Sequence, residues 1–286
     1  MSILSNFYKA INNSQAMKNI LFYKYVPLEK LENLQEELLQ KCTSLSLLGK
    51  ILIATEGVNG CVSGENKAIE KIKKYIITSP IGEIEFKEGK TTQHTFKKMF
   101  VRIRNEIITT NYPCSLKNKA DYIEPEELRE LLDNKGEVLL VDARNLYESK
   151  IGKFEDALTP DINVFSEWPD AVKKLKSCKD KPIVTYCTGG IRCEKASAYM
   201  KEQGFTNVRQ LHGGIIRYGQ EIGNSHWEGK CFVFDQRGAI EIDPQQNTQP
   251  ITQCEICHLP EDSYQNCAHV HCDKFFIVCD TCYENF

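Results

Sequence analysis

Cys187 begins a short loop that contains two glycines and ends in a cation. The loop reads Cys187, Thr188, Gly189, Gly190, Ile191 and Arg192. A cysteine becomes a nucleophile only when its thiolate is stabilised. Here an apolar strand at 182–186 precedes the loop, and a helix expected over 193–203 directs its N-terminal amides back at it. The two glycines allow a backbone nest, and Arg192 adds a permanent positive charge. The pattern predicts a reactive, ionised Cys187.

A second thiol follows directly, at Cys193. It either resolves an oxidised Cys187 or packs beneath the helix, and packing is the favoured interpretation. Cysteine phosphatases also place Cys and Arg around an anion, but they need five intervening residues. Here four residues separate Cys187 from Arg192, and Cys193 stands where the phosphatase arginine would be. This class is therefore excluded.

Six of the thirteen cysteines fall in the last 33 residues, as three short-spaced pairs. The pairs are Cys254 and Cys257, Cys267 and Cys272, and Cys279 and Cys282. Such spacing places two thiolates on one tetrahedral zinc ion. The first and last pairs make the best single site for a structural zinc, and the middle pair is either optional or part of a second site. The alternative is a loosely ordered tail of reduced thiols.

A strand expected over 96–108 has one apolar face and one basic face. Lys98, Phe100, Arg102 and Arg104 share the basic face. Three cations and an aromatic side chain suit single-stranded nucleic acid. An ordinary amphipathic strand with a solvated side is an equal alternative.

Charge is unevenly divided along the chain. Residues 1–120 contain 18 Lys and Arg against 11 Asp and Glu, although the whole chain has a net charge of -3. A basic first part predicts a polyanionic partner, and an uneven spread of solvated charge explains the counts about as well.

The elements that position these residues fall into an α/β multidomain arrangement. In residues 1–120, the expected order is a strand at 20–26, a helix at 28–41, a strand-turn-strand unit at 49–64, a helix at 65–77 and the strand at 96–108. This order predicts a ferredoxin-like α+β domain.

Residues 121–230 alternate between helical and strand patterns. A helix is expected at 125–133, with buried strands at 138–141, 182–186 and 208–211. Such alternation predicts a parallel sheet, whose active sites lie at the carboxyl ends of the strands, where Cys187 falls. Residues 231–286 form a small cysteine-rich tail.

No apolar run approaches the roughly 20 residues of a membrane span, so we expect no membrane contact. The N-terminus has no apolar block after a basic start, which argues against a signal peptide and for the cytoplasm.

Asp142, Arg144 and Glu148 follow the strand expected at 138–141, and the segment 211–214 closes the region that contains the Cys187 loop. By these features, residues 123–222 resemble rhodanese domains. The resemblance implies a cysteine that carries sulfur as a persulfide. Asp142, Arg144 and Glu148 are expected to orient the loop, and a purely structural ion pair is an equal alternative.

A narrower resemblance covers nearly the whole chain. The blocks at 22–25, 54–60 and 187–195 resemble the rhodanese-domain tRNA uridine hydroxylase family. This implies hydroxylation of carbon 5 of the wobble uridine, with molecular oxygen as cosubstrate, the tRNA anticodon loop as partner and Cys187 as catalytic residue, supported by Arg192. No obligate protein partner is inferred. Two rivals remain, a thiosulfate or persulfide sulfurtransferase and a non-catalytic RNA-binding protein.

Overall fold

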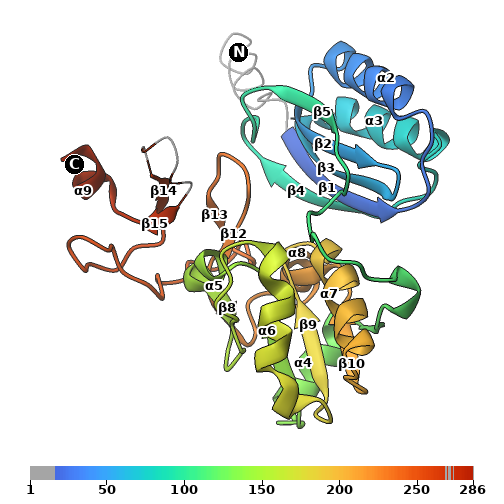
Figure 1. The fold of residues 1–286 in the computed structure, drawn as a ribbon. Helices are drawn as coiled ribbons and strands as arrows, with labels where there is room; N and C mark the ends of the chain where they lie inside the picture. The colour runs from blue at the N-terminus through green and yellow to red at the C-terminus, as the bar shows by residue number, and fades with distance from the viewer. Residues whose placement is uncertain (1–16, 268, 270–271, 273, 286) are drawn as a thin grey trace, which may run out of the picture. The chain divides into compact units, whose positions relative to one another are not determined.

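The computed structural model describes residues 17–267, 269, 272 and 274–285. It divides into two compact units, one ending at Thr109 and the other beginning at Thr110 (Figure 1). None of the helices in these residues is long and apolar enough to cross a membrane.

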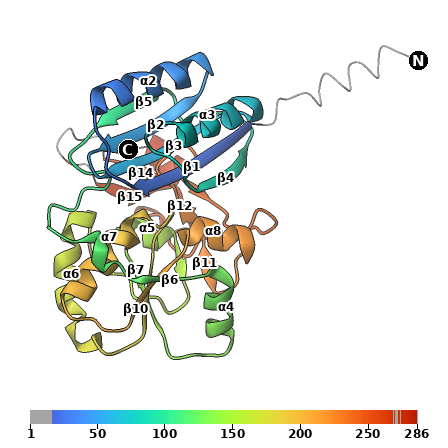
Figure 2. The same ribbon diagram turned by 90° about the vertical axis from the view of Figure 1, so that its right-hand side faces the viewer.

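The first unit is a five-stranded sheet covered on one face by two helices (Figure 2). Its elements are β1 (Met17–Tyr25), α2 (Leu31–Ser44), β2 (Leu48–Ala54), β3 (Gly57–Glu65), α3 (Asn66–Thr78), β4 (Phe86–Thr91) and β5 (Met99–Ile103). The sheet order is β4-β1-β3-β2-β5. Apolar residues of both helices, such as Leu38 and Ile72, pack with Ile20 and Ile51 of the strands into one core.

The strand that completes the split βαβ order is β4, which pairs antiparallel with β1. The sequence pattern did not predict β4. The prediction that the strand expected at 96–108 is the last strand of the split βαβ order was wrong. That strand, β5, is instead an additional edge strand and runs parallel to β2. The reason is composition: β4 reads FKEGKT, with one large apolar residue, so no alternating apolar pattern marks it.

The two faces of β5 divide as its alternation predicts. Val101 is buried, whereas Phe100 and Arg102 are exposed. Lys98 and Arg104, which flank the strand, are exposed as well.

The second unit is built on a four-stranded parallel sheet of order β6-β10-β9-β7. Its elements are β6 (Asp121–Ile123), α4 (Pro125–Asp133), β7 (Leu139–Asp142), α5 (Leu146–Ile151), β8 (Gly152–Phe154), α6 (Trp168–Lys174), β9 (Ile183–Tyr186), α7 (Ile191–Glu202), β10 (Val208–Leu211), α8 (Gly214–Glu221) and β11 (Trp227–Gly229). Helices α4 and α8 pack together, as do α6 and α7. The buried sheet fits the continuous apolar runs of its strands.

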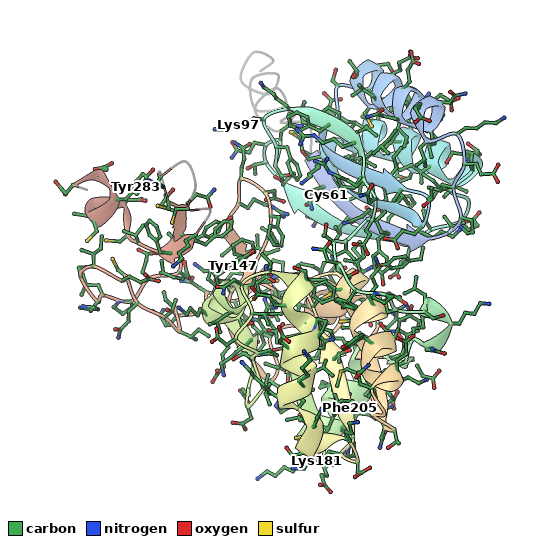
Figure 3. All side chains as sticks on the ribbon, viewed as in Figure 1. Cys61, Lys97, Tyr147, Lys181, Phe205 and Tyr283 are labelled. Carbon is green, nitrogen blue, oxygen red and sulfur yellow. The ribbon has the colours of Figure 1, made fainter. Side chains whose placement is uncertain are left out.

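The C-terminal segment packs onto this unit through small elements. They are β12 (Cys231–Phe232), β13 (Ala239–Ile240), β14 (Tyr264–Asn266), β15 (Phe275–Ile277) and α9 (Asp280–Glu284). Phe232, Ile277 and Ile151 form a buried cluster, against which Tyr147 of α5 and Phe275 of β15 pack. Figure 3 labels Tyr147 on α5.

Candidate active site

Cys187 lies at the carboxyl end of β9, in the turn that leads into α7. The helix begins at Ile191, two residues earlier than predicted, because Gly190 adopts a left-handed conformation with φ 99° and caps it. Glycine adopts this conformation without steric cost. The short turn therefore aims the first amides of α7 at the thiol.

The Cys187 sulfur is surrounded by hydrogen-bond donors. The Gly190 N–H donates to Sγ over 3.2 Å. Burial is the largest single influence on this thiol and raises its pKa. The Cys193 thiol, the Arg192 charge and the backbone N–H groups of Cys193 and Arg192 act in the opposite direction and together lower the pKa of Cys187 to about 6. A thiolate is thus the main form at neutral pH.

Cys187 is fully buried, with 0% of its surface exposed. Its immediate partners are amides, a thiol and a guanidinium group, so the surroundings favour an anion although solvent does not reach it. Protein donors therefore stabilise the thiolate in place of water.

Arg192 is held beside Cys187 by Glu148. The guanidinium donates two hydrogen bonds to the Glu148 carboxylate, of 2.5 Å and 2.9 Å, and Nη2 lies 3.4 Å from the Thr188 hydroxyl. Glu148 is completely buried at the start of α5. Because the pair is bidentate, it fixes the plane of the guanidinium as well as its position.

Asp142 and Arg144 form a separate, fully buried ion pair. Arg144 donates to both Asp142 oxygens and, over 2.6 Å, to the carbonyl of Gly152. Ser149 also donates to Asp142. This pair ties the end of β7 to α5 and β8, so it supports the helix that carries Glu148 and does not itself contact Cys187 in any hydrogen bond that we observe among the described residues.

Gly214, at the start of α8, is a site residue that the sequence analysis gave no role. A Cβ atom there would lie 2.4 Å from the Cys187 carbonyl oxygen and 2.8 Å from the Gly190 nitrogen. The N–H groups of Ile215 and Ile216 hold the carbonyls of Cys187 and Thr188 at 3.0 Å. The doubled glycine ahead of a helix was the available signal.

Cys193 lies in the first turn of α7, where its side chain is buried and hydrogen bonded to Cys187. This burial accords with the predicted packing role. Burial, followed by the Cys187 thiolate, raises the pKa of Cys193. It is therefore the protonated donor of the pair, and its role in resolving an oxidised Cys187 stays a prediction.

Four tail cysteines converge. The sulfurs of Cys254, Cys257, Cys279 and Cys282 all lie within 4.8 Å of one another. The Cys257 and Cys279 sulfurs are 3.8 Å apart. Four sulfurs at about 2.3 Å from a tetrahedral zinc would be separated by about 3.8 Å, so the thiols fit this ion. Cys267 and Cys272 lie outside this cluster in the described part of the tail.

The basic face of β5 is more crowded with charge than predicted. The Arg102 guanidinium lies 4.8 Å from the centre of the Phe100 ring. Lys50 of β2 pairs with Phe100 in register. Burial and then the charges of Arg102 and Arg104 lower the pKa of Lys50. Cations held this closely repel one another, and a bound phosphate would relieve that repulsion.

Three families match the chain in succession. They are described as the UPF0176 acylphosphatase-like domain (residues 17–107), the rhodanese-like domain (residues 124–221) and the rhodanese C-terminal region (residues 228–286).

Curated relatives match over most of the chain. A tRNA uridine(34) hydroxylase of Cytophaga hutchinsonii is 38% identical over 268 residues, which cover 93% of this chain and 85% of that protein. The protein of the same name in Bacillus licheniformis is 39% identical, covering 91% of this chain and 84% of its own. A third, in Chlamydia abortus, is 37% identical, covering 93% and 83%.

Proposed function

The chain belongs to the tRNA uridine(34) hydroxylase family, and we propose that Cys187 is the residue at which its reaction takes place. The protein hydroxylates uridine at the wobble position of tRNA. The observation that carries the role of Cys187 is the set of hydrogen-bond donors around its sulfur, which together with the Arg192 charge lower its pKa to about 6. Glu148 holds Arg192 in place through hydrogen bonds. A thiolate so placed is a nucleophile at neutral pH.

In this proposal the product is 5-hydroxyuridine and molecular oxygen is the cosubstrate. One oxygen atom enters at carbon 5, and the second is reduced to water by two electrons from an external reductant. Arg192 keeps Cys187 ionised, and Glu148 positions Arg192. Asp142 and Arg144 hold α5 in place, since Asp142 accepts a hydrogen bond from Ser149 of that helix and Arg144 donates one to the carbonyl of Gly152, which follows it.

The three parts of the chain have distinct tasks in this proposal. Residues 1–120 bind the anticodon arm through the basic face made of Lys98, Phe100, Arg102 and Arg104. A wobble base is unpaired, so it turns out of its loop without the melting of a helix. Residues 121–230 carry the reactive cysteine, and residues 231–286 bind a structural zinc. A tRNA substrate is available in the cytoplasm, which supports a cytoplasmic location in this proposal.

The zinc proposal rests on four thiols whose sulfurs lie within 4.8 Å of one another, because four thiolates are the full ligand set of a tetrahedral structural zinc. Cys254, Cys257, Cys279 and Cys282 would hold the ion, and its chemistry there would be structural cross-linking.

The decisive experiment compares Cys187→Ala with Cys178→Ala, a half-buried cysteine outside the loop. In cells that depend on each variant, nucleoside analysis of tRNA should show loss of hydroxylated uridine with Cys187→Ala and normal levels with Cys178→Ala. Normal hydroxylation with Cys187→Ala would reject the catalytic role. If the wild type instead releases sulfite and thiocyanate from thiosulfate and cyanide as fast as dedicated rhodaneses and yields no hydroxylated uridine, the sulfurtransferase rival is correct.

A further inference from the structure

Phe234 is a large apolar side chain left exposed next to the reactive loop. It lies between β12 and β13, and 58% of its surface is accessible. Its ring centre is 5.9 Å from the guanidinium carbon of Arg192, the residue that supports the Cys187 thiolate. An aromatic ring over this cation contributes a modest attraction. That attraction alone gives no reason to leave most of the ring in solvent.

The backbone around Phe234 is a closed turn. The Val233 N–H donates to the Gly238 carbonyl over 2.8 Å, and the Gly238 N–H donates to the Asp235 carbonyl over 3.1 Å. The Asp235 carboxylate accepts hydrogen bonds from both the backbone and the guanidinium of Arg237. Hydrogen bonds thus hold the turn that carries Phe234 in one conformation.

The neighbouring aromatic residues anchor this turn to the rest of the unit. Phe234 packs edge-on against Phe232, with ring centres 4.9 Å apart, and Phe232 is fully buried. Phe232 in turn contacts Tyr147 of α5 at 5.3 Å and Tyr264 of β14 at 4.5 Å. Tyr147 stacks on Phe275 of β15 at 4.5 Å. The same packing therefore joins α5, which carries Glu148, to the C-terminal segment.

A pyrimidine base that approaches Cys187 needs a planar surface, because it leaves its stacked neighbours when it turns out of the loop. Stacking on an aromatic side chain stabilises a base whatever its identity, because every base has a π-face. Phe234 is a fixed aromatic side chain, mostly in solvent, next to the cation of the reactive loop.

We propose that Phe234 is the platform on which the target uracil stacks on its way to Cys187, and that the C-terminal segment 231–285 serves to present it. This proposal rests on the proposed function, because the stacked base is the wobble uracil that is hydroxylated at Cys187. It assigns the tail a direct part in substrate binding, through Phe234, in addition to metal binding.

The test uses the full-length protein, an anticodon stem-loop RNA with uridine at position 34, and the variants Phe234→Ala, Phe234→Leu and Phe234→Trp. Loss of stacking should lower kcat/KM for hydroxylation by about 10- to 100-fold in the Ala and Leu variants, and the Trp variant should stay within about threefold of wild type. Tyr283→Ala is the matched control, since Tyr283 is an exposed aromatic residue of the tail on α9 (Figure 3). It should leave kcat/KM unchanged.

A second readout separates stacking from an effect through Arg192. The pH profile of Cys187 alkylation should be the same in Phe234→Ala and wild type, because a platform contacts the base and leaves the thiolate alone. A shifted profile, full activity in Phe234→Ala, or Leu as effective as Phe would each overturn the proposal.

Failure of the proposed function would look different. In that case the wild-type protein itself would form no hydroxylated uridine. Stacking would then be judged from affinity for the same RNA, which should weaken about 10- to 100-fold in Phe234→Ala and Phe234→Leu and stay near wild type in Phe234→Trp.

Discussion

Glu148 and Arg192 stand 44 positions apart in the sequence and share two hydrogen bonds, of 2.5 Å and 2.9 Å, in the interior of the second unit. The carboxylate comes from the first turn of α5 and the guanidinium from the first turn of α7. The pair joins two helices on which the reactive loop depends.

Replacement of Glu148 by Gln keeps the shape of the side chain and removes its charge, so the Arg192 charge stays buried without its counterion. Breaking a buried ion pair in this way costs about 3–5 kcal/mol. We expect the free energy of unfolding in urea to fall by this amount and hydroxylation to be strongly reduced. Asp170→Asn, which breaks a pair with Lys173 in solvent, should unfold like wild type. Equal urea midpoints of unfolding for the wild type, Glu148→Gln and Asp170→Asn would contradict the structural role of Glu148.

The Cys187 thiol should titrate with a midpoint near pH 6, which the rate of alkylation by iodoacetamide measures as a function of pH. Because folding lowers this pKa, the thiolate stabilises the folded state. This stabilisation is fully present above about pH 8.5, the ordinary pKa of a cysteine thiol. That contribution is lost as the pH falls towards 6. Cys193→Ala removes a donor and should move the midpoint to higher pH. Cys193→Ser keeps a donor and should change the midpoint less, and an unchanged midpoint in the Ala variant would rule out the hydrogen bond as a cause.

Local patterns predicted five elements of the second unit closely, namely α4, β7, β9, α7 and β10, and predicted none of the short elements β6, α5, β8, α6, α8 and β11. The helix expected at 125–133 is α4, with the same bounds, because Pro125 and the helical spacing of Leu128 and Leu131 mark it clearly. The strand before Cys187 was also found, since four buried residues in a row form β9.

Relationships between distant segments were not accessible in the same way. Edge strand β4 escaped notice because it has one large apolar residue. Its charged residues instead pair across the sheet, as Glu88 does with Lys18 at 2.6 Å. Phe234 packs on Phe232, which in turn contacts Tyr147 of α5, a residue 85 positions earlier in the chain. Spacing along the chain carries no information on such packing, whereas thiol spacing did single out the four cysteines that meet.

The tail should bind one zinc ion per chain, as measured by elemental analysis of the purified protein. Cys254→Ser or Cys282→Ser removes one of four thiolates and should lower the zinc content to well under one equivalent. Cys267→Ser changes a cysteine outside the cluster and should leave the content unchanged. Zinc content that falls equally in all three variants would contradict the four-thiol site.

The basic face of β5 should contribute to tRNA affinity through charge. Arg102→Ala and Arg104→Ala each remove one cation, so each should weaken binding several-fold at low salt and lower the slope of log affinity against log salt by roughly 1. Lys74→Ala is a matched control, because Lys74 is an exposed cation on α3, which covers the opposite face of the sheet. Filter binding at several salt concentrations measures both quantities. If the Lys74 variant loses as much affinity and slope as the Arg102 variant, the effect belongs to the overall charge of the unit, and the β5 face has no special role. If only the β5 variants lose affinity, the RNA backbone lies along this strand, because counterion release is reported only by the charges that meet phosphates.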